Sequence, residues 1–295
     1  MGTSLRRVSR RDLLCHAAGA AGFACCYSAF SPLFAAAESR GFKIGGCDWS
    51  LGKRGDPAAL DVAKQIGLDG VQADLGTTGN NMRLRTAAHQ RAYRDAMQRT
   101  GLAVSSLAIC EMNDVPLKSD DRAAAWLDQS LDVCKAMKLP LVMAPAFGRG
   151  DLDMARTAEI DHFVKALRGV APKAEKLGLI IGLENYLSAD DNRKILDRVG
   201  SPNVKVYYDV GNSTDKGRDV AKEIRALGSL ICEFHAKDGP HMLGHGRIDF
   251  REVRKAMDDA QYRGWIQLEA AHPHGLVPDY RTDAKYLREI FLSKV

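Results

Sequence analysis

Four apolar segments in the second half of the chain carry, near their ends, residue types that can bind a metal ion or move a proton. These residues are Glu184 in LIIGLENY, Asp209 in VKVYYDV, His235 in LICEFHAKD and Glu269 in WIQLEA. Three carboxylates and one imidazole form a hard, oxygen-rich donor set, which suits one Mn²⁺ or Mg²⁺ ion, with Co²⁺ or Zn²⁺ as alternatives. A bound cation would also offset the mutual repulsion that raises the pKa of clustered carboxylates.

The alternative for each residue alone is a salt bridge or a helix cap. Burying an unpaired carboxylate at the end of an apolar strand is costly, so each acidic residue needs a partner. The recurrence of such residues at four successive segment ends favours one shared site over four separate structural roles.

The rest of the chain shows which elements would bring these residues together. From residue 40 onward, short β-branched runs alternate with longer amphipathic stretches. The predicted strands are residues 42–49, 70–75, 103–110, 141–147, 179–186, 204–210, 230–238 and 265–270. The predicted helices include residues 57–67, 86–100, 119–138, 157–177, 217–227, 247–261 and 281–292.

Eight strands alternating with helices predict an α/β fold, a (β/α)₈ TIM barrel, over residues 40–295 as one domain. The alternative is an open doubly wound sheet, which normally has a glycine-rich phosphate loop after its first strand. Here that position holds DWSLGKRGDP, without GxGxxG or GxxxxGK[ST]. Active sites of TIM barrels lie at the C-terminal ends of the strands, so this fold would converge the four residues on one point.

The N-terminal residues 1–37 are expected to be a twin-arginine export signal. SRRDLL precedes an apolar run rich in small residues, and AAA at 35–37 offers a cleavage site. A basic tail on a membrane anchor is the alternative, but the apolar run is short for a span. We therefore expect a periplasmic or otherwise exported protein that has no stable membrane span after the signal is removed.

Charge and cysteine content restrict the partners. The net charge is +5, and removing residues 1–37, with four arginines and one aspartate, leaves about +2. A chain without a basic stripe offers no case for nucleic acid as a partner. Four cysteines remain after the signal, without a CxxC pair, so the sequence identifies no disulfide.

The motifs GLENY, YYDVGN, FHAKD and LEA, in this order, resemble those of the xylose isomerase-like TIM barrels of the sugar phosphate isomerase/epimerase superfamily. GHGRIDF is similar to that family's GxGxIDF segment, and the resemblance covers about residues 42–292. It implies that Glu184, Asp209, His235 and Glu269 bind one divalent metal, typically Mn²⁺ in the ketose epimerase branch. It also implies that the two glutamates move protons and that the chain pairs as a homodimer or tetramer.

This chemistry is physically reasonable for the residues present. Removing a proton beside a carbonyl requires a base within hydrogen-bond reach and a cation to stabilise the enediolate. Glu184 and Glu269, on opposite sides of a sugar, would deprotonate one face and reprotonate the other. The expected enzyme is a metal-dependent sugar isomerase or epimerase.

Two positions depart from the ketose 3-epimerase pattern. Asn212 stands where those enzymes have a histidine, and His241 stands where they have a substrate-binding arginine. Asn212 would offer a donor and an acceptor to a hydroxyl group, whereas His241 and Lys237 would polarise a carbonyl or act as acids. The alternatives are an exposed loop histidine at 241 and a salt bridge from Lys237 to Asp238 or a site acid.

Other strand ends add candidates for substrate binding. Trp49 would form an apolar wall against a sugar ring or pack in the core. Glu111 and Asp74 would bind hydroxyl groups or act as ordinary loop acids. A second metal at His272 and His274 is disfavoured, because the proline between them indicates a loop and no further ligands are evident.

Three other functions remain as alternatives. A lyase, hydratase or deglycosidase acting on an oxidised 3-keto sugar or glycoside would use the same metal site. A non-catalytic sugar-binding protein would keep the fold without the chemistry. An abasic-site endonuclease shares the barrel, but it needs extra histidines, one of them where Asn212 stands. The expected partner is a small-molecule sugar or glycoside.

Overall fold

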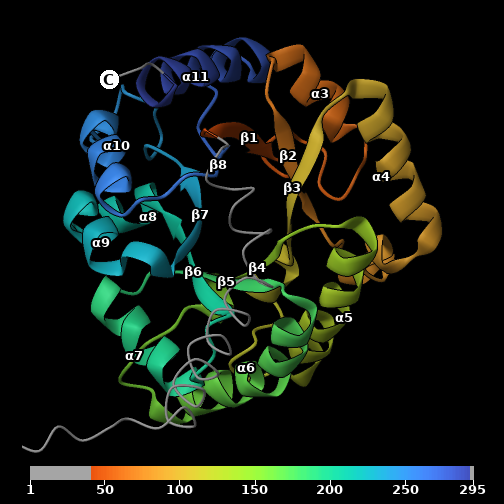
Figure 1. Ribbon diagram of the computed structural model, residues 1–295, viewed down its shortest axis with the longest axis vertical. Coiled ribbons are helices and arrows are strands. Elements are labelled where there is room, and N and C mark those ends of the chain that lie inside the picture. The colour runs from red at the N-terminus through yellow and green to blue at the C-terminus, as the bar shows by residue number, and fades with distance from the viewer. Residues whose placement is uncertain (1–40, 293–295) are drawn as a thin grey trace, which may run out of the picture. The chain divides into compact units, whose positions relative to one another are not determined.

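The computed structural model describes residues 41–292, which form a closed eight-stranded barrel with helices around it (Figure 1). The predicted export signal, residues 1–37, lies outside the described residues. The strands are β1 (Lys43–Cys47), β2 (Gly70–Asp74), β3 (Ala103–Ala108), β4 (Leu141–Ala146), β5 (Ile180–Asn185), β6 (Val204–Asp209), β7 (Ile231–Ala236) and β8 (Trp265–Leu268). The order β1 to β8 is sequential, and β1 pairs with β8 to close the barrel. The predicted TIM barrel is therefore confirmed.

The helices cover the outer face of the barrel (Figure 1). They are α3 (Ala59–Ile66), α4 (Ala87–Thr100), α5 (Asp121–Met137), α6 (Thr157–Leu177), α7 (Ala189–Val199), α8 (Val210–Asp215), α9 (Val220–Leu227), α10 (Phe250–Asp259) and α11 (Leu276–Phe291). Because helices cover one face and the barrel interior the other, strands such as β2 and β4 are buried along their whole length. Among the described residues, no helix has the length and apolarity needed to cross a bilayer.

The interior of the barrel below the strand ends is polar. Glu233, on β7, accepts hydrogen bonds at one oxygen from Ser106 (2.8 Å), Gln267 (2.8 Å) and Tyr207 (3.1 Å). Burial raises the pKa of Glu233 to about 7. Side chains two residues apart on a strand point to the same face, so Glu233 lies directly below His235 in the interior. We call this polar layer, made by Ser106, Tyr207, Glu233 and Gln267, the polar floor.

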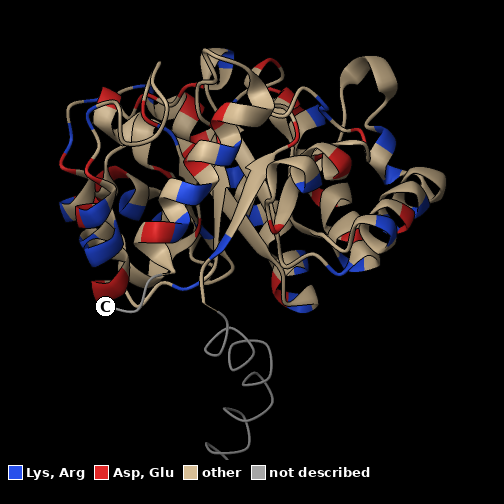
Figure 2. Ribbon diagram, turned by 90° about the horizontal axis from the view of Figure 1, so that it is seen from above, with Lys and Arg blue, Asp and Glu red and all other residues tan. Residues whose placement is uncertain are grey.

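Charged residues of both signs are interspersed around the barrel (Figure 2). Many of them form ion pairs between or along the outer helices, such as Arg225 with Asp259 (2.7 Å) and Lys173 with Asp128 (2.8 Å). Such exposed pairs each contribute little to stability.

Candidate metal centre and active site

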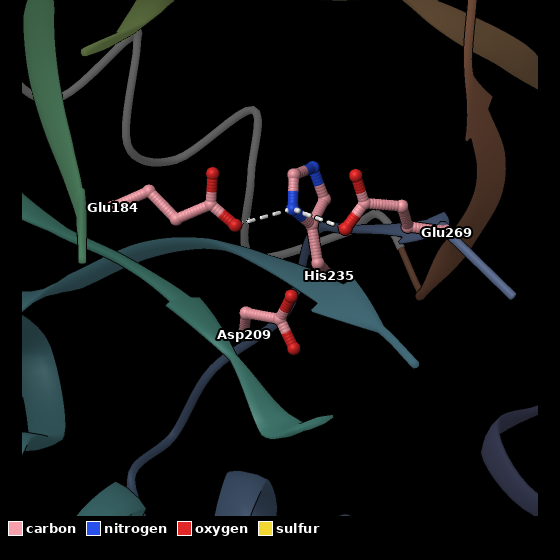
Figure 3. Close-up of side chains that lie close together, drawn as sticks. All are labelled: Glu184, Asp209, His235 and Glu269. Carbon is pink, nitrogen blue, oxygen red and sulfur yellow. Dashed lines mark hydrogen bonds and ion pairs between the residues drawn. The ribbon is translucent and has the colours of Figure 1, made fainter. Parts of the chain in front are cut away.

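Glu184, Asp209, His235 and Glu269 lie together at the C-terminal ends of β5 to β8 (Figure 3). One ligand atom from each residue lies within 4.8 Å of the others. Three of the residues are buried, and Glu269 is half-buried. The convergence expected from the sequence is therefore present in the geometry.

Glu184 and Glu269 approach the imidazole of His235 from opposite sides (Figure 3). Nδ1 of His235 lies 2.7 Å from Oε1 of Glu184 and 3.8 Å from Oε2 of Glu269. Burial disfavours a charged imidazole, but the carboxylate of Glu184 and the hydrogen bond to the Cys47 sulfur raise the pKa of His235 well above its usual value. The two distances show that Nδ1 is the nitrogen that faces the carboxylates.

The carboxyl group of Asp209 is divided between two roles. Oδ1 accepts hydrogen bonds from the backbone N–H groups of Gly211 (2.7 Å) and Asn212 (3.0 Å), which caps helix α8. Oδ2 is buried and accepts no hydrogen bond from the described residues. Burial, together with the charges of Glu269 and Glu184, raises the pKa of Asp209 to about 7. A buried acceptor without a partner is the feature that a bound cation would satisfy.

The far side of the His235 ring is held by residues from β1 and β2. Nε2 lies 2.8 Å from Oε1 of Gln72 and 3.3 Å from Sγ of Cys47. Both Gln72 and Cys47 are completely buried, and burial raises the pKa of the Cys47 thiol to about 12. Because Cys47 remains a neutral thiol, Gln72 is the strong acceptor that orients the ring.

Two further side chains contact Glu269. Nε1 of Trp49 donates to Oε1 at 2.7 Å, and Nζ of Lys237 lies 3.1 Å from Oε2. Burial opposes ionisation of Glu269, but His235, Lys237 and Trp49 outweigh it and lower its pKa. Lys237 also lies 3.8 Å from Asp209, and these two carboxylates raise its pKa against the opposing effect of burial. Glu269 is therefore held as a carboxylate.

A cavity of about 300 Å³ opens above these residues. Its lining consists of Trp49, Arg54, Cys110, Asn113, Asp114, Met143, Pro145, Phe147, Glu184, Tyr186, Asn212, Lys237 and Glu269. Phe147 and Tyr186 form one wall, with ring centroids 4.7 Å apart in an edge-to-face arrangement. The cavity thus combines the acidic side chains of Glu184 and Glu269 with an aromatic wall.

The structure brings Trp49, Asn212 and Lys237 to the cavity, but not Glu111 or His241. Glu111 accepts from the backbone N–H of Thr78 (2.8 Å) and pairs with Arg54 (3.1 Å). His241 is exposed. It lies in the loop after β7, in which the carboxylate of Asp238 accepts hydrogen bonds from the backbone N–H groups of Gly244, Gly246, Arg247 and Ile248.

The remaining candidates have structural contacts. Asp74 is buried, forms an ion pair with Arg54 and does not line the cavity. His272 and His274 are exposed, and within residues 41–292 they do not belong to the cluster of possible metal ligands around His235. Lys237 pairs with Glu269 and not with Asp238.

Several residues of the site, among them Gln72, Cys47 and Arg54, were not predictable from the local sequence. Gln72 lies inside the apolar run GVQADL, where a single polar residue does not interrupt a strand pattern. Cys47 has the signature of an ordinary buried cysteine. Arg54 adjoins Lys53 in the loop after β1, and nothing in the local sequence distinguishes the two.

The fold and the site define a (β/α)₈ barrel with an acidic, partly aromatic cavity at the C-terminal ends of its strands. More specifically, the chain belongs to the xylose isomerase-like TIM barrel family, whose pattern matches residues 60–290. This membership agrees with the sugar isomerase or epimerase class expected from the motifs.

Relatives of known or assigned activity are sugar epimerases by name. The chain is 28% identical to 2-epi-5-epi-valiolone 7-phosphate 2-epimerase of Actinoplanes sp. over 258 residues, covering 83% of this chain and 93% of the relative. It is 24% identical to the putative L-ribulose-5-phosphate 3-epimerase SgbU of Escherichia coli, covering 72% and 82%. A D-psicose 3-epimerase crystal structure in the presence of D-fructose has a similar fold, with a TM-score of 0.71, 16% identity, and coverage of 85% and 100%.

Proposed function

We propose that this protein is a divalent metal-dependent sugar epimerase or isomerase that moves a proton at a carbon next to a carbonyl group. The observation that carries the proposal is the placement of two carboxylates, Glu184 and Glu269, on opposite sides of His235 at the cavity (Figure 3). The family relationship and the epimerase names of the relatives support it.

The residues present fit a divalent cation. Glu184, Asp209, His235 and Glu269 would hold it, because Oδ2 of Asp209 accepts no hydrogen bond within residues 41–292 and one ligand atom from each of the four residues lies within 4.8 Å of the others. The oxygen-rich donor set favours Mn²⁺, with Mg²⁺, Co²⁺ and Zn²⁺ as alternatives. When bound, such a cation would polarise the substrate carbonyl and stabilise the negative charge that develops on its oxygen.

The side chains of the protein itself supply the proton transfer. Trp49 and Lys237 hold Glu269 as a carboxylate, so that it accepts a proton from the substrate carbon on its side. Glu184 lies on the other side of the cluster and, when it carries a proton, would return that proton to the opposite face, which leaves Glu184 as a carboxylate and Glu269 protonated. Removal at one face and return at the other inverts the carbon, which is epimerisation.

The cavity supports a small substrate. Its volume, about 300 Å³, lies at the low end of small-molecule sites and suits a monosaccharide. The edge-to-face pair Phe147 and Tyr186 offers an apolar surface to the C–H groups of a sugar ring. Asn212 and Lys237 would provide hydrogen bonds to hydroxyl or carbonyl oxygens.

Metal analysis and solvent-deuterium exchange test the proposal. We expect about one Mn, Mg, Co or Zn per chain in the purified protein, lost in Glu184→Gln and His235→Ala but kept in Glu289→Gln, an exposed control. Incorporation of deuterium into sugars by the metal-loaded protein should be lost in Glu269→Gln. A wild-type protein without metal would refute the metal proposal, and normal exchange in Glu269→Gln would refute the role of that carboxylate.

A further inference from the structure

Arg54 is fixed at the edge of the cavity by two acidic side chains. Nε donates to Oδ2 of Asp74 at 2.6 Å, and Nη2 donates to Oε2 of Glu111 at 3.1 Å. Asp74 ends β2, and Glu111 lies in the short 3₁₀ helix η3 (Cys110–Asn113) after β3. Glu111 is itself held by the backbone N–H and the hydroxyl of Thr78. The guanidinium is therefore oriented before any ligand binds.

Part of this guanidinium is left for a ligand. An arginine has five N–H donors, and within residues 41–292 Nη1 of Arg54 donates no hydrogen bond. The side chain is 35% exposed and lines the cavity together with Glu184 and Glu269. In the closed barrel, β2 and β3 lie across from β6 and β7, which carry Asp209 and His235. Arg54 thus faces the cavity from the side opposite two of the clustered ligands.

The charges around Arg54 indicate which ligand group it can receive. Its single positive charge is paired with Asp74 and Glu111, and Asp114 adds another carboxylate to the same cavity lining. The other cation of the lining, Lys237, is paired with Glu269. A phosphate dianion would have to displace these carboxylates from the guanidinium, against their repulsion. An uncharged hydroxyl group needs only the free N–H donors.

We propose that Arg54 is a specificity-determining residue that donates hydrogen bonds to hydroxyl groups of an unphosphorylated sugar, while its ion pairs with Asp74 and Glu111 exclude phosphorylated sugars. This inference rests on the proposed epimerase function, because it places the substrate in the same cavity. It separates this chain from relatives whose names specify phosphorylated substrates. Discrimination of this kind depends on repelling the wrong ligand as well as on binding the right one.

The test is solvent-deuterium exchange by the Mn²⁺-loaded protein on matched pairs of sugars. The pairs are D-psicose with its 6-phosphate, D-fructose with its 6-phosphate, and L-ribulose with its 5-phosphate. We expect wild-type kcat/KM to be higher for the unphosphorylated member of each reactive pair. Exchange on the phosphorylated members alone would overturn this inference and leave the proposed function standing. Absence of exchange on all six sugars would overturn both.

Variants then assign the preference to Arg54. Arg54→Met should raise KM for the best unphosphorylated sugar roughly 10- to 100-fold, with kcat and metal content nearly unchanged. The reason is that the lost charge-assisted hydrogen bond stabilises the bound sugar and the transition state equally. Lys53→Met is the matched control, since it removes the same charge from an exposed neighbour that does not line the cavity. An unchanged KM in Arg54→Met would overturn the assignment.

Glu111→Gln addresses the excluding charge without removing the arginine. Arg54 keeps its bond to Asp74 in this variant, so the fold and the donors of the guanidinium are retained. We expect the kcat/KM ratio of free to phosphorylated sugar to fall severalfold, because one competing carboxylate is neutralised. Arg54→Lys, which keeps the charge but loses the fixed fork of donors, should raise KM as Arg54→Met does. An unchanged ratio in Glu111→Gln would contradict exclusion by charge.

Discussion

Replacing Gln72 by methionine should weaken metal binding although Gln72 is not one of the proposed ligands. The amide oxygen of Gln72 lies 2.8 Å from Nε2 of His235, and both residues are completely buried. A methionine is close in size but offers no strong acceptor, so Nε2–H would face only the sulfur of Cys47 at 3.3 Å. The His235 ring would then lose the contact that aims Nδ1 at the carboxylates.

Two independent magnitudes agree on the size of the effect. Leaving a buried donor without its partner costs about 1–3 kcal/mol. Loss of an outer partner of a metal-binding histidine reduces metal affinity about 10- to 100-fold, which corresponds to about 1.4–2.7 kcal/mol. We therefore expect the Mn²⁺ dissociation constant of Gln72→Met to rise by one to two orders of magnitude.

Calorimetric titration of the EDTA-treated protein with Mn²⁺ measures this change directly. Met143→Leu is a suitable control, because Met143 accepts from the other end of the same amide (Nε2 to Sδ, 3.8 Å) and leaves the Gln72–His235 contact in place. Circular dichroism and the Tm of the metal-free variant separate a local effect from unfolding. A dissociation constant within twofold of wild type, in a folded Gln72→Met protein, would refute the orienting role of Gln72.

Three further predictions concern a contact of Glu269, the pH dependence of stability and export. Trp49→Phe removes the indole N–H that donates to Glu269, and the deuterium-exchange kcat should fall about tenfold while the Tm stays within a few degrees; an unchanged kcat would contradict this role. Burial, with the nearby Asp279 and Asp238, raises the pKa of Asp283 from 3.8 to about 7, so the folded state binds the proton more tightly and its contribution to stability is lost as pH rises through about 7. Asp283→Asn should therefore reduce the drop in Tm between pH 5 and pH 8 by several degrees, and an identical drop in both proteins would count against it. We also propose export through residues 1–37: lysine at both Arg10 and Arg11 should retain the protein in the cytoplasm on cell fractionation, whereas undiminished export would exclude the twin-arginine route.

The strands were predictable because both of their faces are buried. Such strands have nearly continuous apolar sequences. The observed bounds Leu141–Ala146 and Val204–Asp209 therefore fall within one residue of the predicted ends. The four clustered residues were predictable for the same reason, since a charged residue stands out at the end of an apolar run. Helix α7 was not among the named stretches, because its sequence ADDNRKILDRV is short and mostly polar.

The contacts between distant strands were not predictable. Gln72 meets His235 only because the closed barrel brings the side chains of β2 and β7 together across its interior, and no local pattern reports that. Arg54 was overlooked because its importance depends on Asp74 and Glu111 from two other strand ends. His241 was placed in the site by its offset from His235, but its side chain is exposed and does not line the cavity.

The polar floor around Glu233 has a consequence for redesigning this enzyme. One carboxyl oxygen of Glu233 accepts from side chains of β3, β6 and β8, so an apolar residue in place of Glu233 would deprive three buried donors of this shared acceptor. Variation aimed at new substrates therefore belongs above the floor, at cavity positions such as Asn113, Phe147 and Tyr186. A mutant library that spares the floor should yield a much larger fraction of folded proteins than one that includes it.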